Sequence, residues 1–218
     1  MHCPGETHTG QPETACAMIC SAFRWKTVKQ TYLQQLMTPK EMEVELSRIA
    51  TEITQGHRNL DSMVLIGIRR RGVPLAQGLQ KKIEKLSGQK LPLGILDITF
   101  YRDDLSLVAT QPVVRGSHLD FDVTDKDVLL IDDVLYTGRT TRAALESVLD
   151  YGRARRIELV VLIDRGHREL PIQADYVGKS VETAEDEVVE VLISSIDGEE
   201  GVFLTTKELL RKGEEADN

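Results

Sequence analysis

The chain has 218 residues, of which 41% are hydrophobic and 28% are charged, a composition typical of a soluble globular protein. Its formal net charge of -8 argues against a protein that binds nucleic acid through overall attraction, although a local basic patch is compatible with that charge. No uninterrupted apolar run is long enough to cross a bilayer. We therefore expect one domain, with or without appendages.

The first 36 residues differ in composition from the rest of the chain. They mix proline, glycine and threonine without a sustained hydrophobic period, and their cysteines, Cys3, Cys16 and Cys20, have a spacing that matches no zinc pattern. Because no cysteine follows them, we expect a fold without disulfides in a reducing cytoplasm. We interpret residues 1–36 as a disordered extension and Met37 as the biological start.

A predicted helix and then a predicted strand follow this segment. Thr38 suits an N-cap and Pro39 the first helical position, and the apolar period continues to about Gln55. The apolar run 63–68 then predicts a strand that is buried on both faces. After an arginine-rich turn, the pattern predicts a helix over residues 73–87.

Three consecutive arginines, Arg69 to Arg71, occupy that turn. One interpretation is a solvated basic corner, because charge runs usually face water. The other is a clamp for an anion, because guanidinium groups bind phosphates through two parallel hydrogen bonds. We favour the clamp, because a second predicted anion site lies further along the chain.

A strand is predicted over residues 93–101, and the polar stretch from Arg102 to Thr124 that follows has no regular period. A loop of that length in a compact domain is either disordered or a functional lid. We interpret it as a lid that closes over a ligand, with Arg102 as a candidate anion contact.

The most informative stretch surrounds Asp132 and Asp133. Four apolar residues, 128–131, predict a buried strand that the acid pair ends. Residues 137–138, a Thr-Gly pair, turn the chain, and residues 140–151 have helical spacing. The sequence therefore predicts a strand, a tight turn and a helix in direct succession.

Such a unit makes an anion site, because the free N–H groups of the first helical turn and the helix dipole point into the turn. Thr137, Thr140 and Thr141 can add hydrogen bonds, and Gly138 lets the backbone approach a ligand closely. Two carboxylates suit hydroxyl groups or a hydrated cation instead. A sugar phosphate satisfies both halves. The alternative is that Asp133 and the threonines only cap a turn and a helix.

Alternation of strands and helices continues beyond this stretch. Further strands are predicted over residues 157–163, 188–193 and 202–204. The pattern implies an α/β fold, a doubly wound parallel sheet with helices on both faces, in which ligands bind at the carboxyl ends of the strands. We assign residues 37–206 to this domain and residues 207–218 to an acidic tail.

Residues 128–141 resemble the diphosphoribose-binding signature of the type I phosphoribosyltransferases: a hydrophobic strand, Asp-Asp, then Thr-Gly and further small hydroxyl residues. Residues 96–106, 164–172 and 174–179 resemble those members that join uracil phosphoribosyltransferase activity to attenuation of pyrimidine operons. The resemblance extends from about Thr38 to the last strand. It implies the type I phosphoribosyltransferase fold with a small hood.

The resemblance also implies the reaction: 5-phosphoribosyl diphosphate and uracil give UMP and diphosphate, with Mg²⁺ held through the substrate diphosphate. Ribose hydroxyls would be held by Asp132 and Asp133, and the diphosphate by Arg70, Arg71 and Arg102, so that Asp132, Asp133 and Arg102 are the candidate catalytic residues. The remaining implied substrate contacts are Thr137, Gly138, Arg139, Thr140 and Thr141 for the 5′-phosphate, and Arg165, Tyr176 and Val177 for the nucleobase.

A second implied function is binding of pyrimidine-operon leader mRNA when UMP is bound. Because RNA loops are read by basic and stacking groups, Arg168 and Lys179 are the candidate RNA contacts. Two alternatives stay open, a UMP-sensing RNA-binding regulator with little turnover and a phosphoribosyltransferase for another base. The resemblance further implies a homo-oligomer, at least a dimer.

Overall fold

The computed structural model describes residues 32–98 and 117–216. The elements in chain order are β1 (Gln34–Met37), α1 (Pro39–Gly56), β2 (Met63–Ile68), α2 (Gly72–Ser87), β3 (Leu93–Leu96), β4 (Asp127–Leu135), α3 (Arg139–Leu149), β5 (Arg156–Asp164), β6 (Tyr176–Ser180), β7 (Glu187–Leu192), α4 (Ser194–Asp197), β8 (Gly201–Thr206) and α5 (Lys207–Ala216). They form a five-stranded parallel sheet, β3-β2-β4-β5-β6, and a three-stranded antiparallel sheet, β1-β8-β7.

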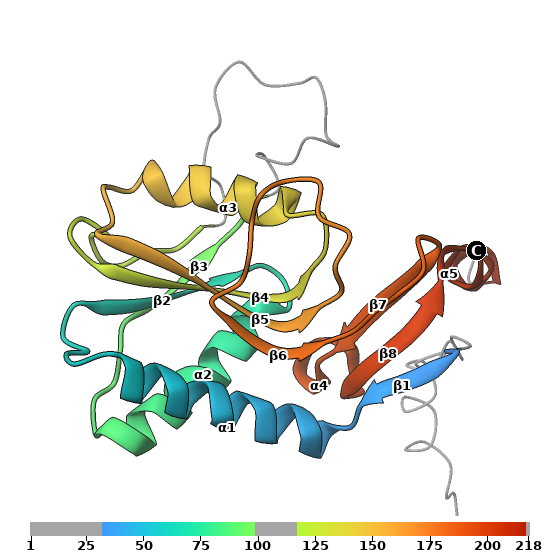
Figure 1. Ribbon diagram of the computed structural model, residues 1–218, viewed down its shortest axis with the longest axis horizontal. Helices are drawn as coiled ribbons and strands as arrows, with labels where there is room; N and C mark the ends of the chain where they lie inside the picture. The colour runs from blue at the N-terminus through green and yellow to red at the C-terminus, as the bar shows by residue number, and fades with distance from the viewer. Residues whose placement is uncertain (1–31, 99–116, 217–218) are drawn as a thin grey trace, which may run out of the picture.

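Helices cover both faces of the parallel sheet: α1 and α2 lie on one face and α3 on the other (Figure 1). Alternate residues of β2 serve the two faces, because successive side chains of a strand point to opposite sides. Met63 and Leu65 pack in the core under α1 and α2, whereas Val64 and Ile66 pack in the core under α3. The continuous apolar run of β2 is thus explained, and the predicted doubly wound fold is confirmed.

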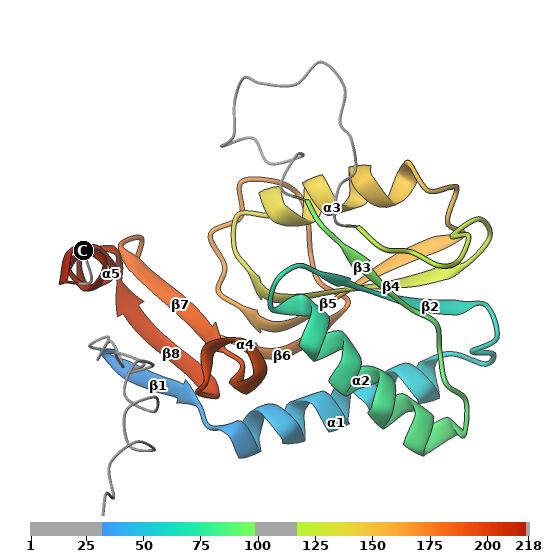
Figure 2. The same cartoon turned by 180° about the vertical axis from the view of Figure 1, so that it is seen from behind.

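The antiparallel sheet β1-β8-β7, together with α4, forms a separate layer beside the parallel sheet, which we call the hood (Figures 1 and 2). Residues 34–36 belong to it, because Gln34 and Gln35 pair with Leu204 and Phe203 of β8. The predicted boundary of the extension at residue 36 is therefore wrong. A chain that began at Met37 would lack most of β1, and the predicted disorder of residues 1–31 lies outside the described residues.

The structure changes two predicted boundaries near the acid pair. Strand β4 continues past Asp132 to Leu135, because its pairing with β5 continues through Val134 and Ile163. Strand β3 ends at Leu96, before the predicted end at residue 101. Of the predicted lid, only residues 117–124 are described, and there His118 forms a β-bridge with Ile95.

The length and hydropathy of the helices show whether any of them could cross a membrane. Within residues 32–98 and 117–216, no helix is both long and apolar enough to cross a bilayer. The longest, α1, has 18 residues, and exposed glutamates occupy its outer face.

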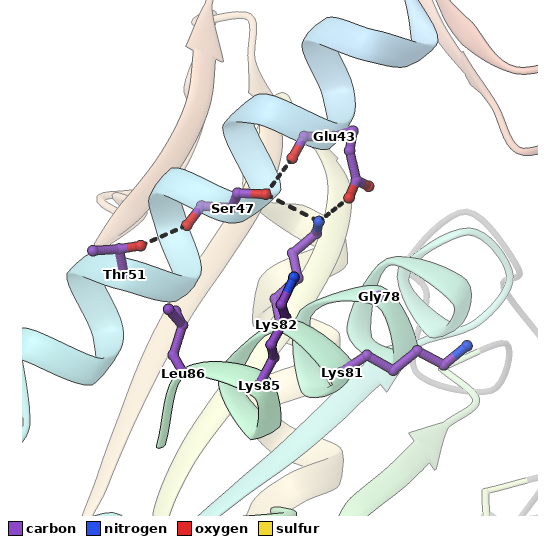
Figure 3. A pocket seen from close by; sticks show the side chains of 8 residues that line it. All are labelled: Glu43, Ser47, Thr51, Gly78, Lys81, Lys82, Lys85 and Leu86. Atoms are coloured by element: carbon purple, nitrogen blue, oxygen red, sulfur yellow. Dashed lines mark hydrogen bonds and ion pairs between the residues drawn. The ribbon is translucent and has the colours of Figure 1, made fainter. Parts of the chain in front are cut away.

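Helix α1 begins as the sequence predicts. Thr38 is the N-cap, and its side chain accepts a hydrogen bond from the Glu41 amide at 3.3 Å, while the Glu41 carboxylate accepts one from the Thr38 amide at 2.7 Å. This reciprocal pair is a capping box. On the outer side of the helix, Lys82 of α2 reaches the Glu43 carboxylate and the Ser47 hydroxyl of α1 (Figure 3). The cap and this contact fix the direction in which the chain leaves the hood.

Replacing Thr38 by alanine should lower the free energy of unfolding by about 1 kcal/mol, because the Glu41 amide in the first turn loses the side-chain oxygen to which it donates. Urea unfolding followed by circular dichroism measures the change. Thr51→Ala is the matched control in the interior of the same helix, where alanine is favoured, and should not destabilise the protein. Equal losses for both variants would contradict the assigned cap.

Candidate active site

A cavity of about 210 Å³ opens at the carboxyl edge of the parallel sheet. Its walls come from three parts of the chain: Arg69–Arg71 after β2, Asp132–Val134 of β4, and Thr140 of α3, with Ile68 and Ile98 as apolar lining. Parallel α/β sheets bind ligands at this edge. The predicted acid pair and arginine run therefore meet at one cavity, and of the predicted hydroxyl-rich turn Thr140 lines it, whereas Thr137, Gly138 and Thr141 do not.

The acid pair supplies the negative wall. Asp132 is buried, 7% exposed, and accepts a hydrogen bond from the Asp133 amide at 3.0 Å. Asp133 is half-buried and accepts one from the Val134 amide at 2.9 Å. Burial, and then the charge of Asp133, raise the pKa of the Asp132 carboxyl well above its usual value. A hydroxyl donor or a cation in the cavity would therefore stabilise the ionised pair.

The β4–α3 turn supplies the predicted anion cup. Gly138 precedes α3 with φ of 90°, a left-handed conformation that favours glycine, and α3 starts without a side-chain cap. A Cβ at Gly138 would lie 3.4 Å from the Ile172 side chain, so Ile172 also packs closely against this turn. The amides of Glu169 and Leu170 donate to the Thr137 carbonyl at 3.0 and 3.2 Å, which anchors the turn.

The β2–α2 turn supplies the positive wall. A Cβ at Gly72 would lie 2.4 Å from the carbonyl oxygen of Ile131, so only glycine lets this turn approach β4 so closely. The approach brings Arg70 and Arg71 to the cavity that Asp132 also lines. The peptide bond between Arg69 and Arg70 is cis.

Two of the three arginines have carboxylate partners. Arg69 lies 3.3 Å from Asp97, and Arg71 donates to both carboxylate oxygens of Asp197 in the hood, at 3.3 and 3.1 Å. Burial opposes the charge of Arg71, but Asp197 and then Asp133 raise the pKa of Arg71 above its usual value. Asp197 was not predicted, because 126 residues separate it from Arg71 and no local pattern joins them.

The side chains of the cavity can also be compared with the ligands that a metal ion needs. Within residues 32–98 and 117–216, no group of three or more His, Cys, Asp or Glu side chains could hold a metal. Asp132 and Asp133 nevertheless fit Mg²⁺, which is often held by one or two carboxylates together with substrate phosphates. A phosphate ligand would have to supply the remaining oxygen ligands of such an ion.

Arg165 and Arg168, predicted as nucleobase and RNA contacts, bind within the fold. Arg165 is 5% exposed, donates to the Glu187 carbonyl at 2.8 Å and stacks on the Tyr136 ring at 4.0 Å. Arg168 donates to the carbonyls of Tyr136 and Ile172 at 2.7 and 3.0 Å, and also pairs with Asp164. Both guanidinium groups therefore fix the loop after β5 in this structure, and neither lines the cavity described above.

Tyr176 and Val177 lie on the edge strand β6, away from the cavity lining. The Tyr176 hydroxyl lies 3.2 Å from Nε2 of His57, which follows α1, and the Val177 carbonyl accepts a hydrogen bond from Arg48 at 2.6 Å. Lys179, the second predicted RNA contact, donates to the Leu36 carbonyl at 2.8 Å. The structure does not bring these residues to the acid pair, so their ligand roles stay predictions.

The remaining predicted residues divide between the turn and the undescribed loop. Arg139 starts α3 and pairs with Glu169 at 2.6 Å, Thr140 lines the cavity, and Thr141 is buried, 3% exposed. Arg102 lies outside the described residues.

Comparison with known proteins connects this geometry to a family. Residues 33–193 match the phosphoribosyl transferase domain. A bifunctional protein PyrR from Caldicellulosiruptor bescii is 52% identical over 171 residues, which cover 78% of this chain and 94% of that protein. One from Pelotomaculum thermopropionicum is 54% identical over 170 residues, which cover 78% of this chain and 94% of that protein.

Solved structures agree at the level of the fold. A hypoxanthine phosphoribosyltransferase from Staphylococcus aureus has a TM-score of 0.61 at 23% identity, covering 82% of this chain and 95% of that chain. One from Trypanosoma cruzi has a TM-score of 0.64 at 18% identity, covering 85% of this chain and 96% of that chain. From the domain match and the sequence identities, the chain belongs to the phosphoribosyltransferase domain family and, within it, to the bifunctional PyrR proteins.

Proposed function

We propose that this protein transfers the phosphoribosyl group of 5-phosphoribosyl diphosphate to uracil, giving UMP and diphosphate, and that it also regulates pyrimidine genes by binding their leader mRNA in response to UMP. The observation that carries the catalytic half is the single cavity lined by Asp132, Asp133, Thr140 and the arginine turn. Membership of the PyrR family supports uracil as the acceptor and RNA as the regulatory partner.

Each wall of the cavity has a part in this reaction. Asp132 and Asp133 hold the ribose hydroxyls and oppose the positive charge that develops on the sugar as its bond to diphosphate breaks. The amides and hydroxyls from Thr137 to Thr141 hold the 5′-phosphate. The two contacts fix the ribose from opposite ends, so that its C1 atom faces the acceptor nitrogen of uracil.

The leaving diphosphate faces the arginine turn. Arg70 and Arg71 stabilise the negative charge that this group gains as the bond to C1 breaks, with Arg102 as a further proposed contact. Mg²⁺, when bound to the substrate diphosphate and the acid pair, would supply additional charge neutralisation. We further propose that the protein acts in the cytoplasm as a homodimer or a larger assembly.

Replacing both acids in an Asp132→Asn, Asp133→Asn variant should lower kcat/KM roughly a hundredfold or more, because the charge that opposes the developing cation is lost. Pyrophosphate release from 5-phosphoribosyl diphosphate and uracil, with Mg²⁺ omitted and restored, measures the reaction. The matched control is Asp61→Asn with Asp186→Asn, two exposed acids outside the cavity. Wild-type rates in the acid-pair variant would remove the proposed mechanism.

The Asp132→Asn change alone should stabilise the ligand-free protein at neutral pH. The pKa of Asp132 is higher in the folded protein than in the unfolded chain, so the folded protein favours the protonated carboxyl. The contribution of this protonated carboxyl to the free energy of unfolding is fully present below the unfolded-state pKa, and it is lost as the pH rises through the folded-state pKa. The variant's advantage in free energy of unfolding should therefore grow as the pH rises above the unfolded-state pKa of an aspartate, about 4. Urea unfolding without Mg²⁺ measures it, and a variant less stable than wild type at neutral pH would contradict the assigned burial cost.

A groove between α1 and α2 supports the RNA-binding half. This hollow of about 440 Å³, larger than the catalytic cavity, is lined by Lys81, Lys82 and Lys85 of α2 and by Ser47 and Thr51 of α1 (Figure 3). Lys82 is paired with Glu43, whereas among the described residues Lys81 and Lys85 have no ion-pair partner. Exposed lysines beside hydroxyl groups suit a phosphate backbone.

A Lys81→Glu, Lys85→Glu variant should therefore bind pyrimidine leader RNA on the order of tenfold more weakly, with a shallower dependence on salt. Filter binding across salt concentrations, with and without UMP, provides the measurement. Lys126→Glu with Arg153→Glu makes the same change of charge outside the groove, directly before β4 and in the turn between α3 and β5, and should leave binding nearly unchanged. Equal losses in the two variants would indicate general electrostatic attraction and contradict a site in the groove.

A further inference from the structure

Arg71, which lines the catalytic cavity, forms an ion pair with Asp197 of the hood. Its Nε donates to one carboxylate oxygen of Asp197 at 3.3 Å and a terminal nitrogen donates to the other at 3.1 Å. The two side chains are partly shielded, with 31% and 17% of their areas exposed. A two-point contact fixes the orientation of a planar guanidinium group as well as its position.

The other edge of the Arg71 guanidinium is the one available to a ligand. The two bonds to Asp197 use Nε and one terminal nitrogen, and among the described residues the second terminal nitrogen makes no hydrogen bond. Arg71 also lines the cavity that holds Asp132 and Asp133. An arginine held along one edge by a carboxylate can still bind a phosphate through its remaining donors.

Asp197 is itself fixed by the hood. It ends the short helix α4, and its carboxylate accepts a hydrogen bond from the Ile193 amide at 2.8 Å. Glu190 of β7 adds a second negative charge near Arg71, and the Tyr32 hydroxyl donates to Glu190 at 3.4 Å. The position of Arg71 therefore depends on an acidic wall that belongs to the hood.

We propose that Asp197 is a positioning residue that holds Arg71 ready for the diphosphate group of the substrate. The inference rests on the proposed function, because it takes that diphosphate as the ligand of Arg71. Asp197 acts on the donor substrate only, since it touches the arginine turn and not the acid pair. The contact also makes donor binding depend on the hood being in its observed place.

Asp197→Asn separates positioning from a merely structural role. Asparagine keeps an oxygen that can accept from the Ile193 amide, but it loses the charge that orients Arg71. We expect a rise of about tenfold in the KM for 5-phosphoribosyl diphosphate and in the Kd for inorganic pyrophosphate measured by calorimetry, equivalent to ~1.4 kcal/mol. The KM for uracil and the unfolding temperature should remain close to wild type.

Two further variants complete the test. Glu200→Gln removes one exposed charge nearby in the hood and should change neither constant. In an Arg71→Ala background, Asp197→Asn should have no further effect on pyrophosphate binding, because it acts through Arg71. Unchanged constants in Asp197→Asn, additive losses in the double variant, or a lower unfolding temperature without weaker pyrophosphate binding would each overturn the proposal.

The failure of the proposed function would look different. Wild-type protein that binds pyrophosphate but does not form UMP from uracil would refute the proposed reaction, and the pyrophosphate measurements on Asp197→Asn would still decide whether Asp197 positions Arg71.

Discussion

The ionisation of Asp132 is opposed by its own surroundings, and the rest of the site is arranged around that fact. The side chain lies within a central strand, buried on the protein side and next to a second carboxylate. Burial of a carboxylate without a cationic partner is unfavourable unless a ligand or a neighbour compensates for it. The proposed ligand, a ribose with two hydroxyl donors and an associated cation, would provide that compensation. The buried position of Asp132 therefore favours binding of a ligand that stabilises its ionised form.

Two glycine-containing turns bring the arginines and the start of α3 close to Asp132. Because Gly72 has no side chain, the arginine turn can lie against the carbonyl of Ile131, the residue directly before Asp132. Gly138 lets the chain turn from β4 into α3, and the Arg139 amide at the start of that helix donates to the Thr137 hydroxyl at 3.4 Å. The sheet fixes both turns, because β2 and β4 are paired in parallel along their length. Opposite charges can therefore face one cavity without neutralising each other directly.

The parts of this arrangement that are local in sequence could be predicted, and the parts that are not local could not. The strand at 63–68, the capping of α1 by Thr38 and the turn after Asp133 each follow from neighbouring residues. By contrast, the family resemblance implies that Arg165 and Arg168 contact ligands, and only the folded chain shows that they bind backbone carbonyls. The partner of Arg71 lies 126 residues away, on an element of four residues. Strand β1 was missed because its four residues, pairing with a strand near the other end of the chain, carry no periodic signal.

The proposed mechanism requires one sugar phosphate to span the acid pair and the start of α3. A crystal structure of the protein with UMP tests it most directly. In that structure we expect the ribose hydroxyls within hydrogen-bond distance of Asp132 and Asp133, and the phosphate on the amides from Gly138 to Thr141. A nucleotide bound with its phosphate at the arginine turn and its ribose away from the acid pair would contradict the account.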